Sequence, residues 1–193
     1  EGSSEQCIYG VRMKDWFTPD YSTVNLLTQN KRMTVDGPVV EHEGSAKAWG
    51  VNEGPFMIKR NGTYMLTFSV YHYEDINYQI RLATSTKPLE SFTKIDPYNG
   101  GTVIRTTFEW DGILTTAGHH SFIEVGDEVY IAYHTFKNRM SIERGRALAI
   151  DKVNFVNHNG KEVMYTNGPT FGYQALPIEV SGYENVANVN NVS

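Results

Sequence analysis

The sequence predicts an all-β fold built from repeated antiparallel units. Two hairpin-like segments recur at an offset of 66 residues, and no stretch has the pattern of a convincing amphipathic helix. Four pairs of like residues keep the offset without a gap: Phe56 and Phe122, Tyr64 and Tyr130, Leu82 and Leu148, and Ala83 and Ala149. A period of this size with several strands per unit is typical of propeller blades, which are small antiparallel sheets around a central channel.

The segment before the repeat carries weaker signals. Ile8–Met13 has the pattern of a short strand, and residues 14–30 are expected to be irregular, with Pro19 as a breaker. Asp36-Gly37-Pro38 indicates a turn, and residues 41–48 are polar and would suit one short helix.

Each repeated unit begins with a hairpin. In the first unit, two strand-like runs flank Asn61-Gly62, and in the second, two such runs flank Gly126-Asp127. The strands expected in the first unit are Phe56–Lys59, Tyr64–Phe68, Tyr78–Thr84 and Phe92–Ile95. Those expected in the second are Ser121–Val125, Val129–His134, Arg146–Ile150, Val153–Phe155 and Lys161–Tyr165.

The length of the chain sets the number of blades. At about 66 residues per blade, 193 residues make roughly three blades, whereas propellers have four or more. An open three-bladed wedge would leave long unpaired sheet edges. We therefore expect residues 1–185 to be the C-terminal part of one propeller domain, and residues 186–193 to be a loose polar tail. The rest of the propeller is expected in a second chain or a missing N-terminal segment.

Composition excludes several kinds of partner. The net charge is −5 and no basic patch is present, which argues against nucleic acid. No stretch approaches the roughly 18 apolar residues of a membrane span. Cys7 is the only cysteine, so an internal disulfide is excluded. Aromatic residues make up 12% of the chain, which suits a β-rich fold or a sugar-binding surface.

Two short motifs open the first strands of the two units. They are Glu53-Gly54-Pro55 and Gly118-His119-His120-Ser121-Phe122. At the offset of 66, Glu53 and His119 occupy the same position, and both would face the channel. Adjacent side chains on a strand point to opposite faces, so only one of the two histidines can do so.

Glu53 is the candidate catalytic acid. Glycoside hydrolysis needs one carboxylic acid to protonate the leaving oxygen and a second carboxylate on the other face of the sugar. A glutamate at the start of an inner strand suits the first role, because neighbouring carboxylates in an acidic pocket disfavour its ionised form. Taken alone, the tripeptide also fits a surface glutamate before an ordinary Gly-Pro turn.

These motifs in combination resemble glycoside hydrolase family 43 over roughly residues 50–177. The segments that carry the resemblance are Val51–Phe56, Asn61–Ser69, Tyr78–Ser85, Pro88-Leu89, Phe92–Lys94, Ala117–Phe122, Tyr130–His134, Gly145-Arg146, Ile150–Val153, Gly168–Thr170, Gln174 and Pro177. The resemblance implies a five-bladed propeller and an inverting glycosidase that acts on arabinose- or xylose-containing plant polysaccharides.

The resemblance also implies roles for single residues. Glu53 matches the general acid of the family. His119 matches a histidine near the propeller axis, which in many members binds a central calcium or other cation, and we also expect it near the substrate. Arg146 resembles an arginine that reaches the terminal-sugar pocket, although Arg144 is a near neighbour.

Aromatic residues on connecting segments are further candidates for sugar subsites. Tyr71 and Trp110 lie between predicted strands, and aromatic faces stack on the apolar faces of sugars. Ordinary loop packing explains the same residues equally well.

The chain departs from the family pattern in one respect. The family uses two aspartates that precede the glutamate, one as general base and one that tunes the acid and orients the sugar. Asp15, Asp20 and Asp36 precede Glu53, and none has the matching context. Both aspartates are therefore expected outside this chain, which alone would lack the base.

The function predicted from the sequence is cleavage of α-L-arabinan or arabinoxylan, or of their oligosaccharides, with inversion. Three alternatives remain: a β-xylosidase on the same scaffold, a non-catalytic sugar-binding propeller fragment, and a structural propeller used for protein contacts. The polymeric substrate alone suggests an extracellular or periplasmic location. No organic cofactor is expected.

Overall fold

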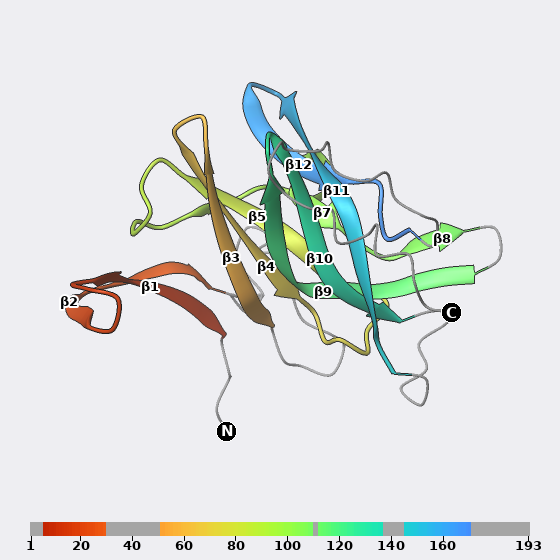
Figure 1. Ribbon diagram of the computed structural model, residues 1–193, viewed down its shortest axis with the longest axis horizontal. Coiled ribbons are helices and arrows are strands. Elements are labelled where there is room, and N and C mark those ends of the chain that lie inside the picture. Colours follow the sequence, from red (N-terminus) through yellow and green to blue (C-terminus); the bar gives the residue numbers. More distant parts are fainter. Residues whose placement is uncertain (1–5, 30–50, 110–111, 137–144, 171–193) are drawn as a thin grey trace, which may run out of the picture.

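The computed structural model describes residues 6–29, 51–109, 112–136 and 145–170. These residues form antiparallel strands and one short 3₁₀ turn, with no α-helix among them (Figure 1). In this described part, no helix is long and apolar enough to cross a membrane. The all-β prediction is therefore confirmed for the described residues.

The strands form three sheets. The first pairs β1 (Cys7–Met13) with β2 (Pro19–Gln29). The second contains β3 (Asn52–Arg60), β4 (Thr63–Val70), β5 (Gln79–Ser85) and β6 (Thr93–Lys94) in that order, and β7 (Thr102–Ile104) also pairs with β5. The third contains β12 (Lys161–Thr166), β11 (Ala147–His158), β10 (Glu128–Phe136), β9 (Gly112–Val125) and β8 (Thr107–Glu109). The turn η1 (Pro97–Asn99) precedes β7.

The segment before the repeat is more regular than its sequence indicates. Residues 14–30 were expected to be irregular, but Pro19–Gln29 forms β2 and pairs with β1. Pro19 does not break this strand because it is the first residue, where its missing N–H is tolerated. The predicted turn at 36–38, the short helix at 41–48 and the tail at 186–193 lie outside the described residues.

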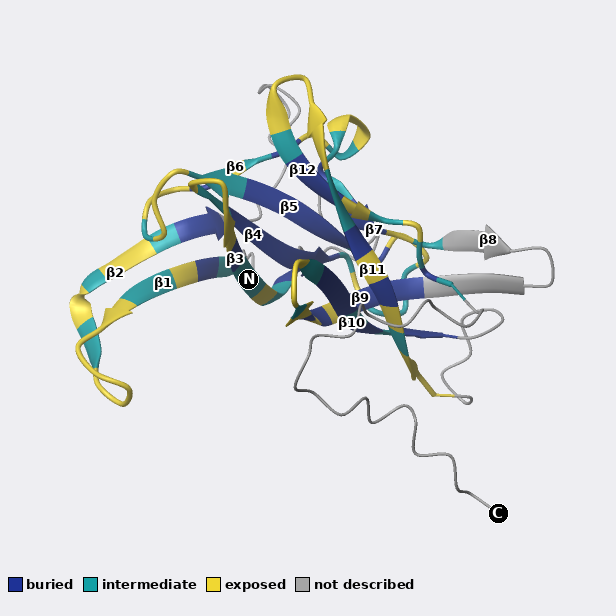
Figure 2. Ribbon diagram, turned by 45° about the horizontal axis from the view of Figure 1, so that its top comes forward, coloured by how far each residue is buried: buried dark blue, intermediate teal, exposed yellow. Residues whose placement is uncertain are grey.

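The second sheet is covered on both faces. Along β4, Met65 belongs to the core shared with the third sheet, whereas Leu66, Phe68 and Val70 belong to the core shared with β1 and β2. Successive side chains of a strand point to opposite faces, so a strand between two layers is apolar on both. Figure 2 shows β4 and β5 as nearly continuous buried strands between the two neighbouring layers.

The hairpins of the two units superpose at a different offset from the one that the sequence predicts. Glu53 pairs with Ser69 and Gly118 with His134, so both members of the second pair lie 65 residues further on. Gly118 is therefore the structural equivalent of Glu53, and His119 is the equivalent of Gly54. The prediction that Glu53 and His119 share one position is wrong, because the turn of the second hairpin lies 65 residues, and not 66, after the turn of the first.

Both inner strands carry a β-bulge at this point. The bulge lies between Glu53 and Phe56 in the second sheet and between Gly118 and Ser121 in the third. Gly54 has a φ of 54° and His119 a φ of 50°, so the equivalent residues share the left-handed conformation. A bulge bends the strand and redirects its side chains, which is why the motif residues leave the regular alternation of the sheet.

Candidate active site

Glu53 lies at the bulge of β3 with its carboxylate accessible. Its side chain is 41% exposed, and its Oε1 accepts a hydrogen bond of 2.8 Å from the Tyr78 hydroxyl. His119 Nδ1 lies 3.9 Å from the same oxygen. The carboxylate is thus held at one oxygen, and these contacts leave Oε2 available to a ligand.

Tyr78 is a fully buried residue whose hydroxyl reaches the site. Burial, reinforced by the Glu53 carboxylate, raises the pKa of Tyr78, so the phenol stays protonated and donates. Its ring packs against the backbone of Gly118, where a Cβ would lie 2.0 Å from the ring carbon Cε1. Only a glycine fits there, and the bulge of β9 therefore determines where Tyr78 can lie.

His119 is positioned by its backbone as well as its ring. Its N–H donates to Ser69 Oγ at 2.8 Å, and Ser69 is the ladder partner of Glu53. A Cβ on Gly54 would lie 3.3 Å from the His119 ring. The side chain is 58% exposed, whereas that of the adjacent His120 is buried, which confirms the prediction that the two point to opposite faces.

His134 and Arg146 extend the cluster beyond Tyr78. The His134 ring stacks on Tyr78 and on His119, with centroids 6.1 Å apart in both pairs. The Arg146 guanidinium lies 2.8 Å from His134 Nε2 and 5.0 Å above the Tyr73 ring. Burial, aided by the Arg146 charge, lowers the pKa of His134 to about 4, so this imidazole is neutral near pH 7. The Arg146 charge thus lies on an exposed rim next to His134, whose ring stacks on both Tyr78 and His119.

The other residues predicted for the site have different surroundings. Tyr71 lines a large cavity whose lining includes none of Glu53, His119 and Arg146. Trp110 and Asp36 lie outside the described residues. Asp15 accepts from Phe17 N and Asp20 from Ser22 N, so both serve the hairpin between β1 and β2.

The described residues do not make a calcium site around His119. Calcium prefers six to eight oxygen ligands, whereas His119 offers one nitrogen and its neighbour Glu53 offers one carboxyl group. No group of three or more His, Cys, Asp or Glu side chains in the described part of the chain is arranged to hold a metal ion. We therefore derive no chemical step from a metal, and the calcium expectation stays a prediction.

Sequence reasoning missed Tyr78, Ser69 and the role of His134. Tyr78 and His134 were assigned only to predicted strands, without a part in the site. One signal was available: Gly118 precedes the histidine pair, and a glycine in a strand often marks a bulge or the close approach of another group. The sequence did not show which group approaches, because Tyr78 lies 40 residues away, next to a strand of the other sheet.

Comparison with known protein families matches residues 4–160 to glycosyl hydrolases family 43. The chain belongs to this family. The match begins well before Gly50, so β1 and β2 are part of the family domain together with the two larger sheets.

One protein sequence and two solved structures illustrate what this chain is similar to. The β-D-galactofuranosidase xynD of Aspergillus niger is 32% identical over 107 residues, which cover 55% of this chain and 29% of the relative. A thermostable family-43 glycoside hydrolase of known structure has a TM-score of 0.71 at 25% identity and matches 90% of this chain. An α-L-arabinofuranosidase from Lactobacillus brevis has a TM-score of 0.62 at 21% identity and matches 88% of it.

The fold is thus part of a five-bladed β-propeller, as the sequence predicted. This chain spans 51% of the first solved structure and 49% of the arabinofuranosidase, about half of each. The described sheets contribute two blades and a two-stranded ribbon next to them.

Proposed function

We propose that this family-43 chain supplies the acid half of an inverting glycoside hydrolase that acts on arabinose-containing plant polysaccharides or their oligosaccharides. The observation that supports this most strongly is the setting of Glu53. Its carboxylate is accessible, is held at Oε1 by a buried tyrosine, and lies beside His119 and the His134–Arg146 pair.

In this mechanism, Glu53 Oε2 carries the proton that passes to the glycosidic oxygen as the bond to the anomeric carbon breaks. A water molecule, deprotonated by a general base on the other face of the sugar, forms the new bond and inverts the anomeric carbon. We place that base, and the second aspartate, outside this chain. Arg146 and His119 would contact hydroxyl groups of the terminal sugar.

The sugar assignment rests on names that relatives carry. The Aspergillus niger relative is named a galactofuranosidase and the Lactobacillus brevis structure an arabinofuranosidase, so both names refer to sugars with five-membered rings. These names support the proposal of a furanosyl substrate, and xylose stays the alternative because a solved structure of comparable likeness is named an endo-1,4-β-xylanase. The test below distinguishes this proposal from two alternatives, a β-xylosidase and a non-catalytic sugar-binding fragment.

The test compares Glu53→Gln with the wild type in the longest natural form of the protein that includes this chain. Removing a general acid typically costs about 10²–10⁴-fold in rate. We expect a loss of this size on debranched arabinan, where the leaving group needs a proton. On an aryl arabinofuranoside with a strongly acidic phenol the loss should be much smaller, because that leaving group departs without one.

Glu124→Gln is the matched control, since Glu124 is an exposed glutamate of the same inner strand as His119. It should retain activity on both substrates. Equal losses of Glu53→Gln on both substrates, or no loss, would contradict the acid role. Release of xylose from xylo-oligosaccharides without release of arabinose would favour the xylosidase, and binding without release by the wild type would favour the sugar-binding fragment.

A further inference from the structure

A second cavity lies apart from the Glu53 cluster. It has a volume of about 1130 Å³, and its walls combine residues in and around the second sheet with the end of β12 in the third. The lining residues are Tyr71, Ile76, Asn77, Gln79 and Arg81, most of residues 97–106, and residues 165–168. Glu53, Tyr78, His119, His134 and Arg146 are absent from its lining. Pockets that bind small ligands are usually about 300–1,000 Å³, so this one is large enough for an oligosaccharide.

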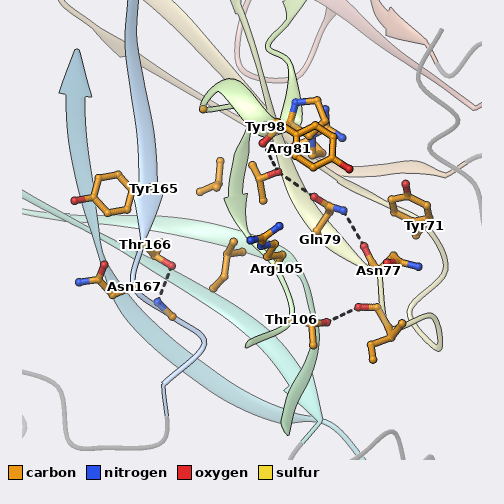
Figure 3. A pocket seen from close by; sticks show the side chains of 17 residues that line it. Tyr71, Asn77, Gln79, Arg81, Tyr98, Arg105, Thr106, Tyr165, Thr166 and Asn167 are labelled. Carbon is orange, nitrogen blue, oxygen red and sulfur yellow. Dashed lines mark hydrogen bonds between the residues drawn. The ribbon is translucent and has the colours of Figure 1, made fainter. Parts of the chain in front are cut away.

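The wall formed by the second sheet is organised by its own hydrogen bonds. Thr102 Oγ1 donates to Gln79 Oε1 at 3.1 Å, and Gln79 Nε2 donates to the Asn77 carbonyl at 3.1 Å. The Thr106 hydroxyl also donates to the Ile76 carbonyl. Figure 3 shows this row of polar groups, with Gln79 at its centre. The groups are held in place before any ligand binds, which lowers the entropy lost on binding.

Aromatic rings stand at the edges of the cavity. Tyr98 on η1 is 88% exposed and Tyr165 on β12 is 38% exposed, and Figure 3 shows Tyr165 and Tyr71 on opposite sides of the space. Asp96 caps η1 by accepting from Tyr98 N at 2.8 Å, which fixes the backbone that carries this ring. Tyr71 has a φ of 67°, a strained conformation for a bulky residue and one that is concentrated at ligand sites.

The charges of the lining have one sign. Arg81 is buried, and its guanidinium donates to the Gly101 carbonyl at 3.1 Å and the Ile95 carbonyl at 3.3 Å, so its charge is fixed in the wall. Arg105 is exposed and lies in the space between Gln79 and Tyr165 in Figure 3. Among the described residues that line the cavity, none is acidic. The charged residues of the lining thus differ in sign from the chain as a whole, whose net charge is −5.

We propose that this cavity is a second, non-catalytic sugar site that binds an oligosaccharide bearing a carboxylate, such as a uronic acid side group. Arg105 pairs with the carboxylate, Tyr98 and Tyr165 stack on sugar rings, and Gln79 bonds to hydroxyl groups. Guanidinium and carboxylate groups match in planar geometry, which makes arginine selective for this ligand over a neutral sugar. The proposal relies on the proposed function only for the class of ligand, and it does not require Glu53 to be catalytic.

The test measures binding in the Glu53→Gln protein, in which hydrolysis does not interfere. Isothermal titration compares a xylo-oligosaccharide that bears one glucuronic acid with the neutral oligosaccharide of the same length. We expect the acidic ligand to bind at least about 10-fold more tightly, and its advantage to shrink at high salt. Arg105→Gln should reduce its affinity to that of the neutral ligand, and Tyr98→Ala should weaken both.

Two substitutions serve as controls, because they alter exposed residues of β1 that are distant in sequence from the cavity. Arg12→Gln and Tyr9→Ala should leave binding unchanged. With Glu53 intact, Tyr98→Ala should keep full turnover of a small aryl arabinofuranoside, which separates this site from catalysis. Equal affinity for the two ligands, absence of binding, or binding that is insensitive to both Arg105→Gln and Tyr98→Ala would overturn the proposal, whether or not the enzyme is active.

Discussion

At the scale of single residues, the site depends on contacts between side chains that are far apart in sequence. Glu53 lies on β3, Tyr78 precedes β5, and His119 lies on β9. The Tyr78 hydroxyl occupies one oxygen of the Glu53 carboxylate, and this contact orients the other oxygen. In the proposed mechanism, Tyr78 is thus a positioning residue, which acts on the substrate through Glu53.

Tyr78→Phe tests this role. A hydrogen bond to a charged group contributes about 1.5–3 kcal/mol, so losing it should lower kcat by about 10- to 100-fold with little change in KM. The loss should be greater on arabino-oligosaccharides than on an aryl glycoside with an acidic phenol, because only the former needs a well-placed proton donor. Steady-state kinetics on both substrates would measure the difference.

Tyr130→Phe is the matched control, since its hydroxyl donates to Glu128 at 2.7 Å in the third sheet. It should leave both kinetic constants near those of the wild type. A Tyr78→Phe enzyme whose rate falls equally on both substrates would show that Tyr78 supports the fold and does not position the acid.

At the scale of elements, two bulges bring the site together. The bulge of β3 follows Glu53, which still pairs with Ser69, and the bulge of β9 places Gly118 against Tyr78 and His119 beside Gly54. The inner strands of the two sheets thereby approach each other at one point. The order of the strands within each sheet would not by itself bring Glu53, Tyr78 and His119 together.

Gly118→Ala should disrupt this approach. The added Cβ would lie 2.0 Å from the Tyr78 ring, so the ring or the strand must move. Overpacking of this kind costs about 1–3 kcal/mol, and the displaced hydroxyl would no longer reach Glu53. Urea denaturation should show lower stability, together with reduced activity.

Gly160→Ala provides the comparison. Gly160 has a φ of 78° in the turn before β12, and no heavy atom lies within 4 Å of its added Cβ. This variant should lose only the stability that backbone strain costs and should keep its activity. A Gly118→Ala protein as active as Gly160→Ala would refute the steric argument.

At the scale of the whole molecule, the two larger sheets are joined by buried contacts near the inner strands. The rings of Phe56 and Phe122 meet edge to face with centroids 5.4 Å apart. His120 Nε2 lies 2.6 Å from Thr67 Oγ1, which itself donates to the Phe56 carbonyl at 3.1 Å. Since the hydroxyl proton is used there, His120 is assigned as the neutral Nε2–H tautomer, with Nδ1 buried and without a partner among the described residues.

The stability of the protein should therefore depend on pH through His120. Burial lowers its pKa to about 3 in the folded state, against about 6.5 for an unfolded histidine. Between these values the unfolded chain binds a proton that the folded chain does not. The free energy of unfolding should fall as pH is lowered from 6.5, by up to about 1.4 kcal/mol per pH unit from this residue. His134 contributes in the same direction.

Urea denaturation at pH 7, 5.5 and 4.5 would measure this dependence. His120→Gln should flatten the decline, although its stability at pH 7 would be lower because the contact with Thr67 changes. His158→Gln, an exposed residue next to the β11–β12 turn, should leave the slope unchanged. A slope that is the same in all three proteins would exclude His120 as its source.

The sequence by itself determined the all-β class, the repeated hairpins, the family and the choice of Glu53 as the candidate acid. Such features follow from local alternation, from turn dipeptides such as Asn61-Gly62, and from motifs that are contiguous in the chain. The sequence placed His119 at the position equivalent to Glu53, whereas the strand pairing places Gly118 there. The turn of the second hairpin lies one residue earlier than the offset of 66 predicts, and such a shift changes the register while the two sequences remain similar.

Only the tertiary structure decided which groups surround Glu53. Tyr78 and His119 meet it because bulges and sheet packing bring separate strands together, and sequence spacing does not encode such contacts. The same holds for the second cavity, whose walls combine residues of two sheets. Hydrophobic periodicity specifies which face of a strand is buried, but which neighbour covers it depends on the packing of the whole fold.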